Sequence, residues 1–437
     1  MDKLRLIATG YAYRVLRQGP KFQRMLNESL IRDYWSDVEI NRYQSVHLQK
    51  TIQHAYETTK FYKKWFDKIG VQPGDIKTKD DLHLLPILRK TDIRGIEKEL
   101  VSSKVKFTFK GHSSGTTGSP LRVFRDYHSI NVENVTLRKQ WLWANCNKKA
   151  LRAVLRAHNV ASANATEPPF WIYSPADRQL LMSSFHLAEQ YIPHYIEKLR
   201  HFKPEIMQTF PSSAYEISKF MQENKEQPLK LKAVFTQSET LYPFQRELIN
   251  QFIGPVYDFY GNAERVAWIG DCEHSNYHIM QDYSIVELVP NDDGQYEIVG
   301  TTLHNSAMPF IRYGTGDIVE IEDGDKCPCG RNHPTVKSIV GRQDDVIITP
   351  SGRKIGRLDT TFQDVDHLVG GQIIQEKLDE LKILIVTSDG FNSNDEDQLR
   401  SQLNKRFGDE IKLKITEVEA LPRTKGGKFK LIVSKLT

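Results

Sequence analysis

The residues at positions 112–120, HSSGTTGSP, combine two glycines with five hydroxyl side chains in a stretch that cannot build a core. Strand-like residues flank this stretch at 107–109 and 121–126. Glycine tolerates positive φ, so several backbone N–H groups can point to one place, and convergent donors of this kind bind phosphate. The same residues are equally typical of an ordinary hairpin loop. A Walker loop is excluded because its lysine is absent.

Carboxylates that could bind a nucleotide or its metal occur further along the chain. In DFYGNAE (258–264), Tyr260 offers a flat aromatic face at a strand end, and Glu264 could hold Mg²⁺ with water. A core tyrosine with a surface glutamate is the simpler interpretation. In RYGTGD (312–317), Asp317 follows a Gly-Thr-Gly turn at an expected strand start, where a fixed carboxylate suits ribose hydroxyls.

Three cationic side chains lie near the end of the chain in glycine-containing segments. Arg342 and Arg353 could bind phosphate or carboxylate in fork geometry. Lys428 follows a glycine pair in LPRTKGGKFK (421–430), where a lysine on a loop tip could deliver positive charge to a transition state. The alternative for Lys428 is a solvated basic tail.

The four cysteines are too few for a disulfide scaffold in a chain of 437 residues, and two of them form a C-x-C pair. Three thiolates and one imidazole have the composition of a closed, structural zinc site. The predicted ligands are Cys272, His278, Cys327 and Cys329. His274 and His333 compete for the histidine position, and unligated cysteines are the alternative to zinc. Cys146 is interpreted as a buried apolar residue.

Composition restricts the class of protein. The hydrophobic fraction is 39%, the charged fraction is 26% and the net charge is +5, with Lys and Arg spread along the chain. Nucleic acid is therefore not the expected partner, although a polyanionic small ligand fits. No apolar run approaches the ~18 residues of a membrane span, and the basic start lacks a signal-peptide core, so a cytoplasmic protein is expected. The oligomeric state stays open.

The surrounding elements must position these residues. Residues 1–100 are expected to be mostly helical. Beyond them, strand–helix–strand order favours an α/β fold with a parallel sheet, whose ligand sites gather at the carboxyl ends of strands. The expected strands are 151–158, 204–210, 231–237 and 256–260, and the expected helices are 188–202 and 243–254.

The pattern changes near GRQDD (341–345), which predicts a large domain over 1–342 and a small α+β domain over 343–437. In the small domain, residues 381–389 form an apolar run, and residues 411–418 are an expected strand. Leu399, Leu403 and Phe407 have helical spacing after Asn394, a plausible N-cap.

In this order, the Ser/Thr/Gly loop, Y-G-x-x-E, Y-G-T-G-D, G-R-x-D-D and P-R-T-x-x-G-K resemble the signature series of the adenylate-forming (acyl-AMP) superfamily. The resemblance runs from about residue 107 to the C-terminus. Residues 202–221, 301–317 and 327–334 look most like the phenylacetate–CoA ligase-like branch, including its capsule-biosynthesis relatives. That branch also tends to lack the lysine found after the glycine loop in many superfamily members.

The resemblance implies a large domain of mixed sheets flanked by helices and a small mobile lid, with ATP and Mg²⁺ as ligands. Tyr260, with Gly261 beside it, would stack on adenine. Lys428 would bridge the acid and the α-phosphate, and Asp344 would be the hinge. The remaining implied nucleotide and metal contacts are Ser113, Ser114, Gly115, Thr116, Thr117 and Gly118 for the phosphates, Glu264 for Mg²⁺, Asp317 for the ribose, and Glu239 and Arg342 beside the nucleotide.

The implied reaction joins a carboxylic acid to ATP, releases pyrophosphate and passes the acyl group to a second nucleophile. Three hypotheses remain for the whole protein: a coenzyme A thioester synthetase, an amide- or ester-forming ligase acting on a sugar or amino-acid derivative in surface-polysaccharide synthesis, and a non-catalytic nucleotide or zinc scaffold. The acid is expected between residues 185–215 and the strand ends at 236–265. The candidate lining residues are Phe185, His186, Phe210, Ser212 and Tyr215, with a structural role favoured for His186.

Overall fold

The computed structural model of the chain describes most of residues 10–437. The residues outside the description are 1–9, 13, 113–120, 148, 159, 163, 240, 242, 291–295, 322–325, 340–346, 356–357, 363–364, 420, 423–431, 435 and 437.

A nine-stranded mixed sheet forms the centre of the molecule, with the strand order β14-β10-β9-β8-β7-β6-β3-β5-β4. Five neighbouring strands, β5, β3, β6, β7 and β8, run parallel, and the others are antiparallel to their neighbours. The strands are β3 (Arg152–Arg156), β4 (Trp171–Ser174), β5 (Gln179–Ser183), β6 (Ile206–Thr209), β7 (Ala233–Gln237), β8 (Val256–Gly261), β9 (Trp268–Asp271), β10 (Tyr277–Ile279) and β14 (Thr335–Val336).

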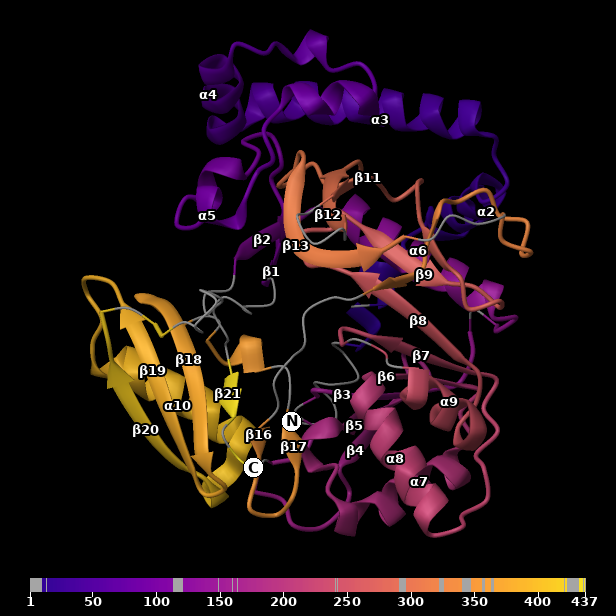
Figure 1. Ribbon diagram of the computed structural model, residues 1–437, viewed down its shortest axis with the longest axis vertical. Helices are drawn as coiled ribbons and strands as arrows, with labels where there is room; N and C mark the ends of the chain where they lie inside the picture. The colour runs from indigo at the N-terminus through magenta and orange to yellow at the C-terminus, as the bar shows by residue number, and fades with distance from the viewer. Residues whose placement is uncertain are drawn as a thin grey trace.

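Helices cover both faces of this sheet, because its central strands are apolar on both sides. Three helices, α7 (Ile192–Phe202), α8 (Pro211–Glu223) and α9 (Pro243–Phe252), share one apolar core with β3, β6 and β7 (Figure 1). On the opposite face lies α6 (Tyr127–Trp143), where Trp141 packs on Phe235 of β7. Two short 3₁₀ turns precede α7, at Ser184–His186 and Glu189–Tyr191.

The N-terminal part is helical, as expected, and α3 begins with a complete capping box between Ser36 and Glu39. The helices are α2 (Phe22–Arg32), α3 (Asp37–Thr58), α4 (Lys60–Ile69) and α5 (Lys90–Ile93), with 3₁₀ turns at Pro73–Asp75, Lys79–Leu84 and Glu97–Leu100. They lie beside a second, antiparallel sheet made of β11 (Ser284–Pro290), β12 (Tyr296–Thr302), β13 (Tyr313–Glu320) and β15 (Ser338–Ile339) (Figure 1).

A hairpin of β1 (Phe109–His112) and β2 (Arg122–Arg125) carries the glycine loop between its strands. Its antiparallel register pairs His112 with Arg122, the last described pair before the loop. The loop itself, 113–120, lies outside the described residues. The expected segment 121–126 contains β2, whereas β1 begins at Phe109, the last residue of the expected segment 107–109. The hairpin brings the ends of the loop together.

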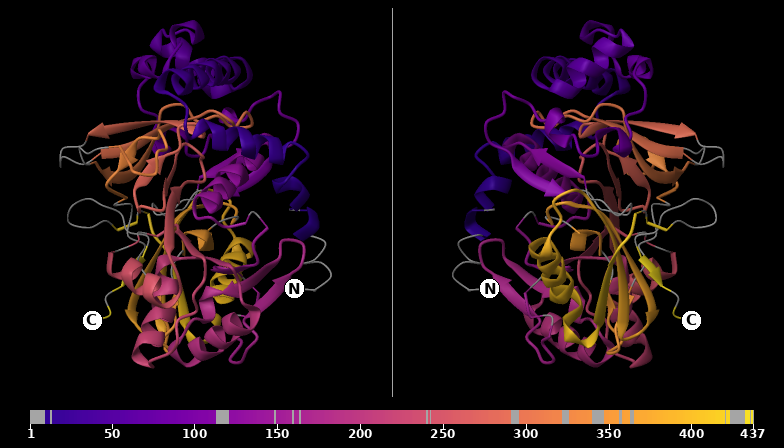
Figure 2. Two further views of the ribbon diagram at one scale, coloured as in Figure 1. Left: turned by 90° about the vertical axis from the view of Figure 1, so that its right-hand side faces the viewer. Right: turned by 90° about the vertical axis from the view of Figure 1, so that its left-hand side faces the viewer.

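The C-terminal part forms its own sheet, with the order β20-β19-β18-β21 and one face covered by α10 (Figure 2). Asn392, rather than the expected Asn394, is the N-cap of α10, because its side chain and Asp395 form a capping box. The elements here are β16 (Ile347–Ile348), β17 (Lys354–Ile355), β18 (Leu368–Lys377), β19 (Glu380–Thr387), α10 (Ser393–Phe407), β20 (Lys412–Glu417) and β21 (Ile432–Ser434), with 3₁₀ turns at Leu358–Phe362 and Gly408–Glu410.

The predicted fold class is confirmed: large mixed sheets are flanked by helices, and a distinct α+β unit follows them. Among the described residues, no helix has the length and apolar character needed to cross a membrane.

Candidate functional site

Tyr260 and Asp317, 57 residues apart in the chain, meet at the carboxyl end of β8. The Tyr260 hydroxyl donates to Oδ2 of Asp317 over 2.8 Å, and Nδ2 of Asn262 donates to the Tyr260 oxygen over 3.3 Å. Burial, followed by the Asp317 charge, raises the pKa of Tyr260 well above its ordinary value. The phenol is therefore neutral and its ring is held in one orientation.

The sequence had suggested that Asp317 lies at the start of a strand, but it lies inside β13. The pairing of β12 with β13 shifts register between Glu297 and Val299, and Gly316 has a φ of 71°. The Thr315 hydroxyl accepts from the Asp317 backbone N–H over 3.0 Å. The Gly-Thr-Gly sequence is therefore an irregularity within one strand, and it turns Asp317 toward Tyr260.

Glu264 lies close to this pair but is buried, with 7% of its surface exposed. The Tyr313 hydroxyl donates to its Oε1 over 3.2 Å. Burial raises the pKa of Glu264, and the Asp317 carboxylate acts in the same direction against the opposing effect of Lys90. A divalent cation would compensate this buried charge, so the residue fits a Mg²⁺ ligand or a ligand of its water shell.

Glu239 lies just beyond the carboxyl end of β7, the neighbour of β8. Its Oε2 accepts from the backbone N–H of Ser212, in the first turn of α8, over 3.1 Å. A carboxylate at a helix N-terminus is stabilised by the helix dipole. Glu239, which is predicted to lie beside the nucleotide, therefore also has a structural role at the start of α8. Gly261 ends β8 at the same edge of the sheet.

Several predicted site residues lie outside the described residues, so their roles stay predictions. They are Ser113, Ser114, Gly115, Thr116, Thr117, Gly118, Arg342, Asp344 and Lys428.

Arg353 is described and serves the C-terminal unit. It is 4% exposed, forms an ion pair with Glu410, and donates to the carbonyl oxygens of Phe407 and Phe185 over 2.8 and 2.9 Å. Its carboxylate partner is therefore a residue of the protein, and it ties the unit to the large sheet.

The four predicted metal ligands come together. One donor atom each from Cys272, His278, Cys327 and Cys329 lie within 4.8 Å of one another. Sγ of Cys272 lies 3.6 Å from Sγ of Cys327, and Sγ of Cys329 lies 3.4 Å from Nε2 of His278. Bond lengths of about 2.3 Å for Zn–S and about 2.0 Å for Zn–N in a tetrahedron require separations close to these.

The surroundings of the cluster favour His278 over the competing histidines. Nδ1 of His278 donates to the carbonyl oxygen of His333 over 3.3 Å, which leaves Nε2 facing the thiols. Burial lowers the pKa of His278 to about 4, so its imidazole is neutral at neutral pH. His333 instead binds Oδ1 of Asp33 through Nε2 over 3.0 Å. The geometry and donor set fit zinc, with no ligand position left for a substrate.

The named lining residues of the predicted acid pocket lie away from the large cavity of the structure, although Gln208, Gln237 and Phe259, from the two predicted ranges, line it. A cavity of about 970 Å³ lies between the sheet and α6, on the face opposite α7–α9, and none of Phe185, His186, Phe210, Ser212 and Tyr215 lines it. His186 is buried and bonded on both ring nitrogens, to Ser183 and to the Ser162 carbonyl, as its expected structural role requires.

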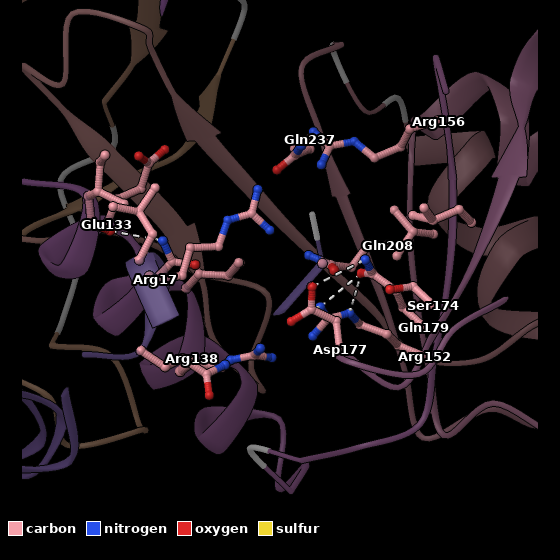
Figure 3. Close-up of a pocket in the computed structure, with 18 of the residues that line it drawn as sticks. Arg17, Glu133, Arg138, Arg152, Arg156, Ser174, Asp177, Gln179, Gln208 and Gln237 are labelled. Carbon is pink, nitrogen blue, oxygen red and sulfur yellow. Dashed lines mark hydrogen bonds and ion pairs between the residues drawn. The ribbon is translucent and has the colours of Figure 1, made fainter. Parts of the chain in front are cut away.

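The sequence reasoning missed the cavity's charged lining (Figure 3), notably Arg138, Arg152 and Arg156. One signal was present in LRAVLR at β3, where Arg152 and Arg156 flank an apolar run.

Comparison with known proteins shows which proteins this chain resembles in sequence and in fold. A family model described as the CapK C-terminal domain matches residues 347–435. Protein CapK of Staphylococcus aureus is 22% identical over 402 residues, which cover 90% of this chain and 89% of that protein. Phenylacetate-coenzyme A ligases of Thermus thermophilus and Escherichia coli are 25% and 26% identical and cover 70% and 71% of this chain, and 71% and 72% of their own lengths.

Among solved structures, a 2-hydroxyisobutyryl-CoA ligase in complex with 2-HIB-AMP and CoA has a TM-score of 0.61 at 20% identity, covering 92% of each chain. An open conformation of the same ligase has a TM-score of 0.58 at 20% identity, covering 92% of this chain and 93% of that one. The fold is thus that of the adenylate-forming ligases. Within them, the chain is related to the phenylacetate–CoA ligase-like branch and its CapK relatives, as its motifs had indicated.

Proposed function

We propose that the protein is an ATP-dependent, AMP-forming ligase that adenylates a carboxylic acid and transfers the acyl group to a second nucleophile. The observation that carries this proposal is the convergence of Tyr260, Glu264 and Asp317, from β8, the loop after it and β13, at the carboxyl edge of a parallel sheet. Ligands of open α/β sheets bind at this edge. The overall similarity to phenylacetate-coenzyme A ligases supports the same class of reaction.

The geometry suits each proposed contact. The carboxylate of Asp317 would accept hydrogen bonds from both ribose hydroxyls. Its hydrogen bond with Tyr260 holds the aromatic ring beside the place that the adenine attached to this ribose would occupy. Glu264 would hold Mg²⁺, which lowers the repulsion between the acid and the triphosphate. The glycine loop would bind the outer phosphates between β1 and β2.

The chemistry needs a cation, because the attacking carboxylate and the α-phosphate are both anions. Lys428 is the proposed source of this charge in the adenylation step. The oxygen of the acid attacks the α-phosphorus, pyrophosphate leaves with the electron pair of the broken P–O bond, and an acyl-adenylate remains. The acceptor then attacks the acyl carbon and AMP leaves.

The deciding experiment is pyrophosphate release from ATP with a panel of carboxylic acids. Release with at least one acid, and its loss in Lys428→Ala with an unchanged melting temperature, supports adenylation. A Lys428→Ala protein that adenylates normally contradicts the mechanism, and no release with any acid favours the scaffold hypothesis. Lys430→Ala, two residues away on the same segment, is the matched control.

The acceptor is tested separately by the mass of the product. Added coenzyme A would give a thioester, whereas amines or hydroxyls of sugar and amino-acid derivatives would give an amide or an ester. The second acceptor class stays in the proposal because the sequence motifs resemble those of capsule-biosynthesis relatives.

A further inference from the structure

The 970 Å³ cavity is lined by an excess of positive charge. Its lining contains seven Arg and Lys side chains against two carboxylates, Glu133 and Asp177. Both carboxylates already have an arginine partner, since Glu133 pairs with Arg265, and Asp177 lies 3.8 Å from Arg152. The lining therefore carries an excess of five positive charges, in a space partly closed from water.

Several buried donors in the lining have no hydrogen-bond partner among the described residues. They are Nη1 of Arg138, Nε of Arg125, Nε and Nη1 of Arg265, and Nε1 of Trp268. Buried donors of native proteins are almost always satisfied, by protein, by water or by a ligand. Nε2 of His158, which can donate or accept, is unpartnered as well, but the arginine and indole groups only donate, so the complementary ligand is rich in acceptor oxygens.

Two of the arginines are held rigidly at one end of the cavity. The guanidinium groups of Arg138 and Arg152 lie 3.7 and 5.3 Å from the ring centroid of Trp141. Arg152 also donates to Oε1 of Gln179 over 3.0 and 2.8 Å. Burial, and then the charge of Arg152, holds the pKa of Arg138 well below its usual range. An anion placed between the two groups would relieve this repulsion.

The other end of the cavity reaches the proposed adenylation site. Gln237 and Phe259 line the cavity, and they immediately precede the segments that carry Glu239 and Tyr260. Along β3, Arg152 and Arg156 face the cavity from the two ends of one strand. Four residues of strand span about 13 Å. Figure 3 shows Arg156 and Gln237 together at one end, and Arg152, Asp177 and Gln179 at the other.

We propose that this cavity holds the acid substrate, and that the acid carries a second anionic group which binds at the Arg138–Arg152 end. The inference rests on the proposed adenylation activity and deepens it. The carboxylate to be activated lies at the end nearest Glu239 and Tyr260, and the second anion lies roughly 10 Å deeper, within the span of β3. A simple apolar acid would leave Nη1 of Arg138 buried without an acceptor, which costs free energy.

The test compares acids of equal chain length, octanedioate against octanoate and hexanedioate against hexanoate, by kcat/KM for pyrophosphate release. The wild-type protein should prefer each dicarboxylate by about tenfold or more, since charge-assisted hydrogen bonds are the strong ones. Arg138→Met should remove most of this preference through KM for the acid, with KM for ATP unchanged. Arg200→Met, on α7 outside the cavity, should keep the preference.

Arg17→Met is the second variant, because Arg138 packs on Trp141 and its replacement could unfold the protein. Arg17 lines the cavity from the partly buried N-terminal segment, and its loss should weaken the preference several-fold. Equal use of mono- and dicarboxylates by the wild type, or a preference that survives both substitutions, would overturn the inference and leave adenylation standing. A rise in KM for ATP in the variants would overturn it as well, by assigning the cavity to the triphosphate.

A binding measurement separates this inference from the proposed function. Calorimetric titration with octanedioate needs no catalysis. If no acid releases pyrophosphate, but octanedioate binds the wild type and not Arg17→Met, the adenylation proposal fails while an anion-binding cavity stands. Absence of octanedioate binding to the wild type, together with absence of turnover of both dicarboxylates, would reject the inference.

Discussion

At the scale of single residues, the proposed nucleotide site depends on hydrogen bonds between side chains that are distant in sequence. Asp317 has two tasks, accepting from the Tyr260 hydroxyl and presenting its carboxylate at the sheet edge. Asp317→Asn preserves shape and an acceptor oxygen but removes the charge. Because hydrogen bonds to charged groups contribute about 1.5–3 kcal/mol, we expect KM for ATP to rise about 10- to 100-fold, with KM for the acid nearly unchanged.

Steady-state kinetics with ATP and acid varied in turn measure this effect. Tyr260→Phe is the matched comparison, since it keeps the aromatic face and removes only the hydroxyl that Asp317 accepts from. It should raise KM for ATP less than Asp317→Asn does. An Asp317→Asn protein with unchanged KM for ATP would show that this carboxylate does not bind the ribose.

At the scale of secondary-structure elements, a buried ion cluster joins three segments beside the metal cluster. Nζ of Lys139, in α6, donates to Oδ1 of Asp33, after α2, over 2.8 Å and to Oδ1 of Asp282, after β10, over 3.0 Å. All three side chains are less than 6% exposed. Burial is the largest effect and opposes ionisation of both carboxyls, but Lys139 and His333, with Arg32 beside Asp282, together outweigh it and hold the pKa of Asp33 and Asp282 below its ordinary value.

Lys139→Met should destabilise the protein by about 3–5 kcal/mol at neutral pH, because it removes the cation shared by two buried carboxylates and leaves only Arg32 beside Asp282 and His333 beside Asp33. The pKa of each carboxyl is lowered in the folded state, so this stabilisation is present above the unfolded pKa of about 4 and is lost as pH falls below it. The difference in unfolding free energy between wild type and variant should therefore be nearly constant from pH 7 to pH 5 and shrink as pH falls from about 4 toward 2.

Urea unfolding across this pH range measures the difference. Lys64→Met is the matched control, because Lys64 pairs with Glu99 at the surface, where ion pairs contribute about 0–1 kcal/mol. A loss of stability in Lys139→Met that is the same at pH 5 and pH 2 would mean that lost packing, and not charge, causes it.

The metal cluster is the second link between elements, joining the β9–β10 turn to the C-x-C segment before β14. We expect about one zinc per wild-type chain and almost none in Cys327→Ser, with a lower melting temperature. Adenylation at temperatures below unfolding should persist, because four protein ligands leave no open position for catalysis.

Metal analysis of protein purified without chelators measures the zinc content. Cys146→Ala is the control, since Cys146 is buried away from the cluster and its loss should leave the zinc content unchanged. Wild-type protein free of zinc would contradict the assignment.

How far the sequence predicts these elements depends on how local their determinants are. The central strands and α7, α9 and α10 follow from apolar runs and helical spacing within one segment. Asp317 was misplaced because the irregularity of β13 arises only in its pairing with β12. The cavity could not be predicted, because Arg138 and Arg152 come together only when α6 covers the face of β3. The cysteines were predictable from residue type alone.

At the scale of the whole molecule, few described polar contacts hold the C-terminal unit against the large sheet. Arg353 donates to the Phe185 carbonyl, and Asn164 forms two hydrogen bonds with Asp409, one of 2.6 Å from Nδ2 to Oδ2 and one of 3.1 Å from the Asp409 backbone N–H. The proposed two-step reaction requires the small domain to rotate between steps, and the Asn164–Asp409 contact must break if it does.

A covalent link across this contact should therefore stop turnover at one half-reaction. In the double variant Asn164→Cys/Asp409→Cys, cross-linking with a short bis-maleimide should reduce steady-state product formation about tenfold or more. Single-turnover measurements should show that one half-reaction, either adenylate formation or acyl transfer, keeps its rate. Each single variant treated with the same reagent is the control for modification alone. Domain rotation about residues near Asp344 is the only proposed reason why Asn164 and Asp409 must separate. A fully cross-linked protein that turns over at the rate of the uncross-linked protein would therefore exclude domain rotation from the mechanism.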